Sequence, residues 1–445
     1  MKNVKFKVRI KIPKQIHLCM LQDLKRTHSF AYERVGFLYT KSKLLSDNTV
    51  LVLATNYAPV DDEDYIEDKS VGAKINSDAI RKSMQKILEE KCGCFHAHLH
   101  DHSGIPSPSF TDQKGLPGVA ISFSNISQTQ ANGILILSEN SFYGSVIYGS
   151  KKQFYSPELI SVIGYPFGLT YPSLKKIGYN KVYDRQSFLG KDSQLFFRNI
   201  KVGIIGYGGG GSHIGQQLAH LGVENICVFD GDKVEDTNLN RLIGAWFTDV
   251  AKQILKTSVA KRIIKKILPK ARVVTINEKW QQKPEMLQIC DIVIGCVDSY
   301  SERQQLEAEC RRYLIPLIDI GMDIHKEDKE PYSISGQVIL SMPGLPCMSC
   351  IGFLTEKKLA KEAAKYGKGG GRPQVVWSNG VLASTAIGVF ADIVNGWTEK
   401  KDSPIYLSYE GNTSCLNEHI RLKFCEKECK HYSFDEIGPP IFSKL

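Results

Sequence analysis

Residues 202–212 read VGIIGYGGGGS, and this short stretch decides how the C-terminal half of the chain folds. An apolar run predicts a strand, the glycines predict a tight turn, and Ser212 stands where a helix begins. Glycine lets the backbone approach a phosphate closely, and a helix N-terminus offers free N–H groups and a positive dipole. The stretch therefore predicts a nucleotide-binding turn between a strand and a helix.

The segments that follow alternate between strand and helix. Apolar runs predict strands at 225–230, 272–279, 291–298 and 316–321, and helical periodicity predicts helices at 212–222, 258–269 and 301–314. This order predicts a mostly parallel, doubly wound α/β sheet. The glycine-rich, basic segment 368–372 (KGGGR) predicts a flexible loop.

The glycine turn alone leaves two nucleotide chemistries open. It also fits the dinucleotide fingerprint Gly-x-Gly-x-x-Gly, with Asp230 where a ribose-binding acid would lie, so an NAD-dependent oxidoreductase is one alternative. The next residues favour an adenylating enzyme. Asp232 adds a second acid for ribose and metal, and residues 238–241 (NLNR) add the Asn and Arg that a polyphosphate needs.

This string resembles the ThiF/MoeB/ubiquitin-activating family, whose signature is Gly-x-Gly-Gly-x-Gly-Ser, then Asp-x-Asp, then Asn-Leu-x-Arg. The resemblance covers about residues 180–445. It implies a Rossmann-like domain that uses ATP and Mg²⁺ to adenylate the C-terminal carboxylate of a ubiquitin-like (β-grasp) protein ending in Gly. The nucleotide-binding residues that it implies are Gly206, Gly208, Gly209, Gly211, Asp230, Asp232, Asn238, Arg241 and Lys256.

The same resemblance implies catalytic residues outside the glycine turn. Residues 183–186 (YDRQ) resemble the family helix whose Arg, here Arg185, reaches the ATP of a partner subunit, which implies a homodimer. Asp298 ends a strand where the family has a metal-linked Asp. We expect Arg303 to be a charge on a helix surface. The implied catalytic residues are Arg185, Arg241, Lys256 and Asp298.

The N-terminal half carries a different set of polar residues. Residues 93–98 (GCFHAH) place two histidines two apart on a predicted strand, so that both share one face. Asp112 follows in a loop and can supply an oxygen ligand. Three protein ligands leave the fourth position of a zinc ion open, as in catalytic sites. Upstream, Glu33 places a carboxylate at the edge of an apolar segment.

These residues resemble the JAMM (JAB/MPN) metalloprotease family, whose pattern is a Glu before a Gly-hydrophobic strand, then His-x-His, then Ser-x-x-Asp. The resemblance implies an α+β JAB/MPN-like domain with Zn²⁺ ligands at His96, His98 and Asp112. Glu33 would act as general base toward a water on the zinc. Ser109 would help to hold the developing oxyanion.

The spacing of the histidines leaves a second ligand pair open. The family usually has about seven residues between the second His and the Ser. Here ten residues separate His98 from Ser109, whereas eight separate His100 from Ser109. We prefer His96 and His98 because they follow the Gly-x-aromatic lead-in, and keep His98 and His100 as the alternative. A histidine-rich strand end that binds no metal is a further alternative, and the Glu and Ser-x-x-Asp in the same order favour metal binding over it.

The N-terminal half is expected to fold as a small sheet with helices. Strands are predicted at 4–12, 49–58, 92–100, 119–124, 133–138 and 145–150. A helix is predicted over 77–91, capped by Ser77 and Asp78, with Ile80, Met84, Ile87 and Leu88 on its apolar face. The predicted domains are 1–174 (JAB/MPN-like) and 175–445 (ThiF-type).

The cysteines point to a structural zinc site. Twelve cysteines without a secretion signal predict reduced thiols and metal ligands instead of a disulfide framework. A Cys-x-x-Cys in a Pro/Gly turn is typical of half a zinc site, and the ThiF-type resemblance implies a second half. The predicted ligands are Cys347, Cys350, Cys425 and Cys429. Seven others are expected in the core: Cys19, Cys92, Cys94, Cys227, Cys290, Cys296 and Cys310.

A thioester intermediate is left open by the sequence. Residues 351–414 contain no cysteine, so Cys415 is the nearest unassigned thiol for a nucleophile. The adenylate itself is the other product that could be passed on.

Bulk composition limits the partners. The 445 residues have 42 % hydrophobic and 23 % charged residues, with a net charge of +10 from scattered Lys and Arg. This distribution does not predict nucleic-acid binding. The absence of an apolar run of about eighteen residues, and of a signal peptide, predicts a cytoplasmic protein without a membrane span.

The two resemblances together imply a bifunctional enzyme. The ThiF-type domain would activate the C-terminus of a ubiquitin-like protein. The JAB/MPN-like domain would cleave the precursor tail or the isopeptide conjugates of the same protein. Such a pairing suits a compact prokaryotic modification pathway, as in antiviral (phage) defence. Three alternatives are sulfur-carrier activation for thiocarboxylate transfer, an NAD-binding oxidoreductase, and a non-catalytic JAMM-like scaffold.

Overall fold

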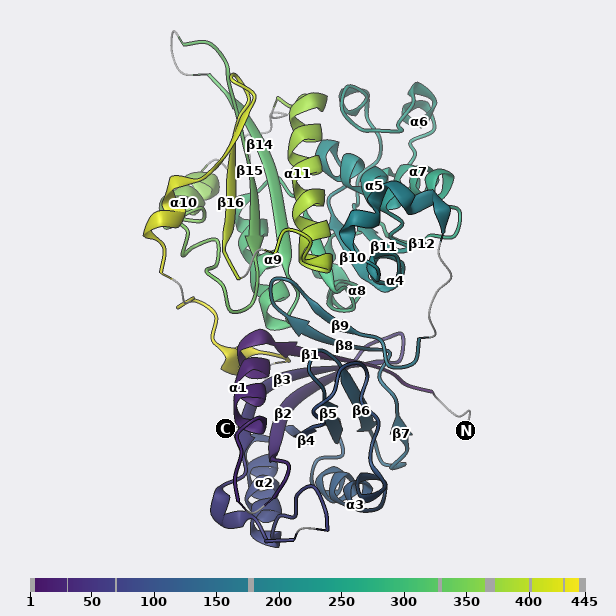
Figure 1. Ribbon diagram of the computed structural model, residues 1–445. Helices are drawn as coiled ribbons and strands as arrows, with labels where there is room; N and C mark the ends of the chain where they lie inside the picture. The colour runs from purple at the N-terminus through teal and green to yellow at the C-terminus, as the bar shows by residue number, and fades with distance from the viewer. Residues whose placement is uncertain are drawn as a thin grey trace. The chain divides into compact units, whose positions relative to one another are not determined.

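The computed structural model describes residues 5–29, 31–68, 70–174, 180–326, 330–364, 373–399, 402–426 and 429–439, and the predicted loop at 368–372 lies outside them. The chain divides into two compact units (Figure 1). Unit 1 contains residues up to Lys175 together with 312–314 and 433–445. Unit 2 contains residues 176–311 and 315–432.

Unit 1 is built on a mixed sheet. Its strands are β1 (Lys7–Pro13), β2 (Val35–Leu44), β3 (Thr49–Pro59), β4 (Gly93–Leu99), β5 (Asn132–Leu137), β6 (Phe142–Ile147), β7 (Phe154–Tyr155), β8 (Leu159–Ile163) and β9 (Gly168–Thr170). Its helices are α1 (Lys14–Leu24), α2 (Ser77–Glu90) and α3 (Phe110–Ile126), with short 3₁₀ turns η1 (Asp62–Asp64) and η6 (Phe434–Glu436). Among described residues the sheet order is β7-β6-β5-β4-β2-β3-β1-β8-β9.

The side chains of strand β4 point alternately to the two faces of the sheet, and each face is covered by an apolar layer. Phe95 and Ala97 belong to the layer that includes α1, together with Met20. Cys94 belongs to the opposite layer, with Phe123 of α3. Since successive side chains of a strand point to opposite faces, His96 and His98 share the face of Cys94. Both histidines are buried beneath the α2 and α3 side of the sheet.

Three local predictions for unit 1 are wrong. Residues 119–124, predicted as a strand, lie inside helix α3, because a capping box at Ser109 starts a helix that continues through them. Helix α2 is capped by Asn76, whose side chain accepts from the two N–H groups of residues 78 and 79, in place of Ser77 and Asp78. Its predicted core residue Leu88 is exposed.

Unit 2 is an α/β sheet. Its strands are β10 (Lys201–Ile205), β11 (Asn225–Phe229), β12 (Arg272–Ile276), β13 (Ile292–Gly295), β14 (Leu317–His325), β15 (Ser333–Ser341), β16 (Ile405–Glu410) and β17 (Cys415–Glu418). Its helices are α4 (Ser193–Asn199), α5 (Gly209–Leu221), α6 (Phe247–Ala251), α7 (Lys256–Ile267), α8 (Pro284–Gln288), α9 (Tyr300–Arg312), α10 (Glu356–Ala364) and α11 (Val376–Asn395). Short 3₁₀ segments are η2 (Lys181–Leu189), η3 (Asp236–Asn238), η4 (Trp280–Gln282) and η5 (Ile420–Phe424).

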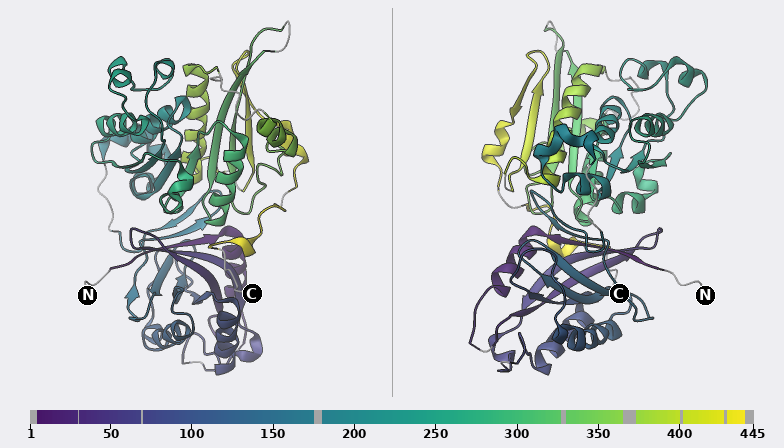
Figure 2. Two further views of the ribbon diagram at one scale, coloured as in Figure 1. Left: turned by 180° about the vertical axis from the view of Figure 1, so that it is seen from behind. Right: turned by 45° about the vertical axis from the view of Figure 1, so that its right-hand side comes forward.

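The strand order of unit 2 creates a switch point. In the described residues the order is β12-β11-β10-β13-β14-β15-β16-β17. The first five strands are parallel and the rest antiparallel, so the predicted parallel sheet is confirmed and extended by an antiparallel half. Because crossovers are right-handed, α5 and α7 cover one face and α9 the other (Figures 1 and 2). The order reverses between β10 and β13, where open α/β sheets bind ligands.

Helix α11 packs along the sheet of unit 2. It contacts α5, β14 and β15 (Figure 1). It is long and apolar enough to cross a membrane by length and composition, and 56 % of its most apolar window is buried inside the protein. A core helix of a soluble protein has these same properties.

Candidate functional sites

The glycine turn leads from β10 into α5 at the switch point. Gly206 has a φ of +86°, a conformation that favours glycine, and a Cβ there would lie 2.8 Å from the carbonyl oxygen of Cys296. A Cβ on Gly211 would lie 2.1 Å from the carbonyl oxygen of Gly206. At Gly208, by contrast, a Cβ would meet nothing within 4 Å. The turn is therefore closed toward the protein and open toward the cavity in front of α5.

The paired acids follow β11 at the edge of this cavity. The Tyr207 N–H donates to Asp230 Oδ2 at 2.7 Å, and the Asp232 N–H donates to Asp230 Oδ1 at 2.8 Å. Asp230 is thus fixed by the glycine turn itself. Burial raises the pKa of Asp230, although Lys256 favours its charged form. Lys256, the first residue of α7, lies 2.7 Å from Asp232 Oδ2.

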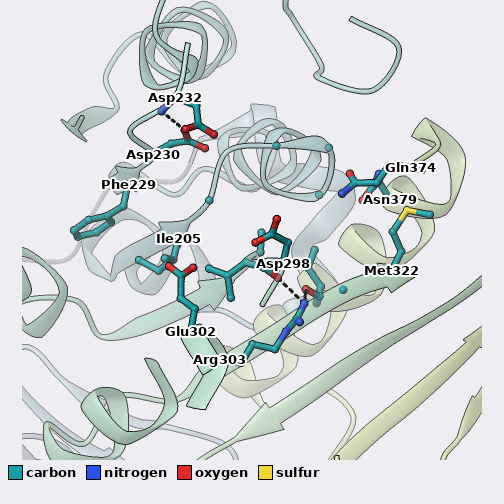
Figure 3. A pocket seen from close by; sticks show the side chains of 18 of the residues that line it. Ile205, Phe229, Asp230, Asp232, Asp298, Glu302, Arg303, Met322, Gln374 and Asn379 are labelled. Carbon is teal, nitrogen blue, oxygen red and sulfur yellow. Dashed lines mark hydrogen bonds between the residues drawn. The ribbon is translucent and has the colours of Figure 1, made fainter. Parts of the chain in front are cut away.

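One cavity of about 1070 Å³ brings the predicted nucleotide residues together. Its lining includes Gly206, Gly208, Gly209, Asp230, Asp232, Asn238, Arg241, Lys256 and Asp298. Figure 3 shows Asp298 between the Asp230–Asp232 pair and the side chains of Gln374 and Asn379. Of the predicted nucleotide residues, Gly211 is not in the lining, because its role is to let α5 pack against the turn.

The structure corrects the expectation for Arg303. Its guanidinium is buried, not on a helix surface, and its Nε donates to both oxygens of the fully buried Asp319 at 3.0 and 3.2 Å. The same side chain donates to the carbonyl oxygen of Val297, next to Asp298. Arg303 therefore holds the segment that follows β13 in place, and it lines the cavity itself.

Three further cavity residues escape sequence reasoning because α10 and α11 come from distant parts of the chain. Asn379 of α11 lies against Gly209, where a Cβ would be 2.5 Å from its Nδ2. Glu362 of α10 accepts hydrogen bonds from the N–H groups of Tyr300 and Ser301, both 2.9 Å long. These two N–H groups begin α9. Glu362 thus ties α10 to the helix that follows Asp298, and Lys358 of α10 also lines the cavity.

Arg185 is placed away from this cavity. It is exposed and lies on η2, which packs against the C-terminal end of α5, because Gln186 donates to the Leu221 carbonyl and Tyr183 lies against Gly222. The cavity lies at the opposite end of α5. A 13-residue helix is about 20 Å long. Arg185 therefore lies too far away to reach the nucleotide residues of its own chain.

In unit 1, the structure gathers Glu33, His98, His100 and Asp112. Suitable ligand atoms of Glu33, His98 and His100 all lie within 4.8 Å of one another. His98 Nε2 and His100 Nε2 are 3.1 Å apart, and they lie 3.5 and 3.4 Å from the two oxygens of Asp112. In a tetrahedron with Zn–N and Zn–O bonds of about 2.0–2.1 Å, ligand atoms are about 3.3–3.4 Å apart. His98 and His100 thus lie close enough together to share a zinc ion, and each faces a different oxygen of Asp112.

The geometry favours the alternative histidine pair. His96 lies deeper in the sheet, fully enclosed and edge-on to Phe37. Burial lowers the pKa of His96 to about 3, so it stays neutral. His100, just past the end of β4, supplies the ring nitrogen that faces Asp112. Spacing alone could have found this pair, because eight residues to Ser109 is the nearer match.

Ser109 and Asp112 form the capping box of α3. The Ser109 N–H donates to Asp112 Oδ2 at 2.7 Å, and the Asp112 N–H donates to Ser109 Oγ at 3.1 Å. Burial opposes ionisation of Asp112, but hydrogen bonds from His98 and Ser109 outweigh it and lower its pKa. The helix start thus fixes an ionised carboxylate toward the two histidines.

The cysteine site has a different fourth member from the one predicted. Cys347, Cys350, Cys429 and His431 lie together, whereas the thiol of Cys425 donates to the carbonyl of Leu422. The Cys347–Cys350 and Cys350–Cys429 sulfur pairs are 3.6 and 3.8 Å apart. His431 Nδ1 lies 3.5 and 3.3 Å from the first two sulfurs.

These separations match a tetrahedral zinc ion. Zn–S bonds of about 2.3 Å place sulfurs about 3.8 Å apart, and place a sulfur and a nitrogen about 3.6 Å apart. Three thiols and one imidazole are a donor set that structural zinc sites use. All twelve cysteines are free thiols, and Cys19, expected in the core, is exposed because it lies on the outer face of α1. Cys415 is also exposed and does not line the cavity.

Comparison with known proteins finds several that are similar to part of this chain. The chain is 33 % identical over 141 residues to a molybdopterin-synthase adenylyltransferase of Haemophilus influenzae, covering 31 % of this chain and 57 % of that protein. It is 22 % identical over 292 residues to ubiquitin-like modifier-activating enzyme 5 of Gallus gallus, covering 60 % of this chain and 67 % of that protein. The chain spans roughly two fifths to three fifths of the first curated relatives it matches.

Among solved structures, E. coli MccB with ATP aligns with a TM-score of 0.46 at 20 % identity, over 58 % of this chain and 75 % of that chain. The model of the ThiF family matches residues 179–430, which is more than half of the chain. The chain therefore belongs to the ThiF family.

Proposed function

We propose that unit 2 is an adenylating enzyme that activates the C-terminal carboxylate of a ubiquitin-like protein ending in Gly. The observation that carries this proposal is the single cavity that collects the glycine turn, the paired acids, Arg241, Lys256 and Asp298. An NAD-dependent oxidoreductase has no use for these last three residues, and the ThiF family match argues against it.

Each residue has a physical role in this reaction. The N–H groups at the start of α5 and the side chains of Arg241 and Lys256 would neutralise the phosphates of ATP. Asp230 would hold the ribose, and Asp298 would hold Mg²⁺. The substrate carboxylate attacks the α-phosphate, pyrophosphate leaves, and an acyl-adenylate forms. The protein contributes position and charge, without a covalent bond.

Pyrophosphate exchange into ATP tests the proposal. The probe is a panel of ubiquitin-like proteins ending in Gly-Gly, each compared with a version lacking the last Gly. We expect exchange only with intact tails, and a loss of about 100-fold or more in Lys256→Ala. Lys261→Ala, an exposed position on the same helix, is the matched control. Equal exchange with truncated tails, or in Lys256→Ala, would refute the assignment.

A homodimer completes this site. Arg185 lies about one helix length from its own cavity, so we assign it to the cavity of a second copy. Mixing Arg185→Ala with Lys256→Ala subunits tests this. If Arg185 acts in trans, mixed dimers keep one intact site, and about a quarter of the wild-type activity returns. If it acts in cis, mixing restores nothing, and if it has no role, Arg185→Ala alone keeps full activity.

For unit 1 we propose a zinc-dependent peptidase that acts on the tail or isopeptide bond of the same ubiquitin-like protein. Its support is the convergence of the ring nitrogens of His98 and His100 with the carboxylates of Asp112 and Glu33. Bound zinc would supply a Lewis acid for the scissile carbonyl. Glu33 stands beside the two histidines, within reach to accept and return a proton.

Zinc content and cleavage test this second function. Wild-type protein is expected to hold about two zinc ions per chain, one in each cluster. His100→Ala should lose one, while His102→Ala, an exposed neighbour, should lose none. Cleavage of tail-extended ubiquitin-like fusions should disappear in His100→Ala. A zinc-loaded wild type that cleaves no fusion would instead favour a non-catalytic scaffold.

Sulfur-carrier activation is the second candidate for unit 2. It uses the same adenylate but ends in a thiocarboxylate, and one matched relative is a molybdopterin-synthase adenylyltransferase. Formation of a thiocarboxylate on the carrier, detected by mass, would favour it over conjugation. We assign either pathway to the cytoplasm of a prokaryote, with antiviral defence as one setting.

A further inference from the structure

A small hollow on unit 1 adjoins the candidate zinc cluster. Its volume is about 150 Å³. The residues that shape it are Asp112, Pro117, Ile134, Tyr143, Ser145 and Phe154, which come from α3, β5, β6 and β7. Asp112 is common to the hollow and to the cluster, so the two are adjacent.

The sheet register places the hollow on the same face as the histidines. Between β4 and β5, His96 pairs with Ile134, and between β5 and β6, Ile134 pairs with Ser145. Directly paired residues point to one face of a sheet. His98 is two residues from His96 and shares this face. A chain held at His98 and Asp112 can therefore extend over Ile134 and Ser145.

The lining suits an apolar side chain. Apart from Asp112 at its edge, the side chains named above carry no charge, and four of the six are a proline, an isoleucine or an aromatic. An apolar cavity of about 150 Å³ accepts a molecule the size of benzene. The hollow also opens at the surface, since Gln113 in its lining is exposed.

We propose that this hollow, the Ser145 pocket, binds the aliphatic or aromatic side chain of the residue that follows the scissile bond. The proposal rests on the proposed peptidase function of unit 1. A tail ending in Gly-Gly has no side chain to place on the other side of that bond. The pocket therefore selects the leaving segment, and it favours a precursor peptide with a large apolar residue immediately after the final Gly.

Peptide cleavage tests the pocket. The probes are internally quenched peptides containing Gly-Gly-X, with X as Phe or Gly. Wild type should prefer Phe. Ser145→Phe, which fills the pocket, should lower the rate for Phe by about tenfold or more relative to Gly. Ser145→Ala keeps the pocket open and should keep the preference. If Ser145→Phe loses zinc, Gln113→Trp at the mouth of the pocket replaces it.

A binding measurement separates this inference from the peptidase claim. Fluorescence anisotropy of the same labelled peptides is measured on zinc-loaded Glu33→Gln and on its double variant with Ser145→Phe. The pocket is supported if Glu33→Gln binds the Phe peptide more tightly than the Gly peptide and the added Ser145→Phe substitution abolishes this difference. This result would stand even if wild type cleaves no peptide and the peptidase proposal is refuted. The pocket proposal is overturned if Glu33→Gln binds both peptides with equal affinity, or if Ser145→Phe lowers the affinity for both peptides equally.

Discussion

The glycine turn offers a matched pair of substitutions with opposite consequences. In Gly211→Ala, the new Cβ would lie 2.1 Å from the carbonyl oxygen of Gly206, against an ordinary C···O contact of about 3.3 Å. Helix α5 must therefore retreat from the turn by about 1 Å. Overpacking of this kind costs about 1–3 kcal/mol, against a gain of about 1 kcal/mol from replacing glycine within a helix.

Because the contact is with backbone, the upper end of this cost applies, so we expect Gly211→Ala to destabilise unit 2 by about 2 kcal/mol, which is about 3 minus about 1. ATP binding should also weaken, because the N–H groups of α5 move away from the phosphates. Gly208→Ala should behave differently. Its Cβ meets nothing within 4 Å, so stability should change by less than about 1 kcal/mol. Its methyl group enters the space in front of α5, and ATP binding should weaken by about tenfold or more.

The assay uses a property of the sequence. The protein has four tryptophans, at positions 246, 280, 377 and 397, and all of them belong to unit 2. Denaturant unfolding followed by tryptophan fluorescence therefore reports on unit 2, and titration calorimetry gives the ATP affinity. The reasoning is refuted if Gly211→Ala is as stable as wild type, or if Gly208→Ala binds ATP with unchanged affinity.

Three further predictions concern the zinc clusters and unit 1. Elemental analysis should find one zinc ion fewer in His431→Ala and no loss in Cys425→Ala; the reverse pattern would restore Cys425 as the ligand. In Gly72→Ala, a Cβ would lie 2.5 Å from Glu33 Oε2, and displacing this carboxylate by about 1 Å should slow tail cleavage by about 100-fold with zinc retained. Unchanged cleavage would remove Glu33 from the mechanism. Burial, with a smaller effect of Lys14, lowers the pKa of His17 to about 4, so the folded state keeps it neutral while the unfolded chain protonates near pH 6.5. Stability from this group is present above pH 6.5 and is lost as the pH falls toward 4, by about 1–2 kcal/mol at pH 5. Hydrogen exchange in α1 should show this loss in wild type and not in His17→Gln, and an equal loss in both would contradict it.

The sequence determined the elements whose signals are local. The strand–glycine–helix stretch at 202–212, and the alternation after it, predicted β10, α5 and the parallel half of the unit 2 sheet. Those predictions are confirmed because the central strands β10, β11 and β13 are apolar runs that are almost wholly buried, whereas the edge strand β12 is partly exposed. The same stretch correctly indicated the nucleotide cavity, since the glycines, Asp230 and Asp232 are close in sequence as well as in space.

Local sequence patterns gave wrong predictions at residues 119–124 and at Arg303. Residues 119–124 have the β-branched and aromatic content of a strand, but the capping box at Ser109 starts a helix that continues through them. Arg303 looked like a surface charge because helical periodicity does not reveal a partner sixteen residues away. Only the fold brings the buried Asp319 to it.

The metal clusters show most clearly which features the sequence determines and which only the tertiary structure decides. Residue types and spacing were enough to indicate one histidine–carboxylate cluster and one cysteine cluster. Spacing could not decide the members, because ligand choice depends on which side-chain atoms converge within a few ångströms. The end of β4 turns His100 instead of His96 toward Asp112, and the chain after Cys429 brings in His431 while Cys425 bonds to the backbone. The sequence thus determined the chemistry of each site, whereas tertiary structure decided its ligands, because a coordination shell depends on distances between atoms and not on distance along the chain.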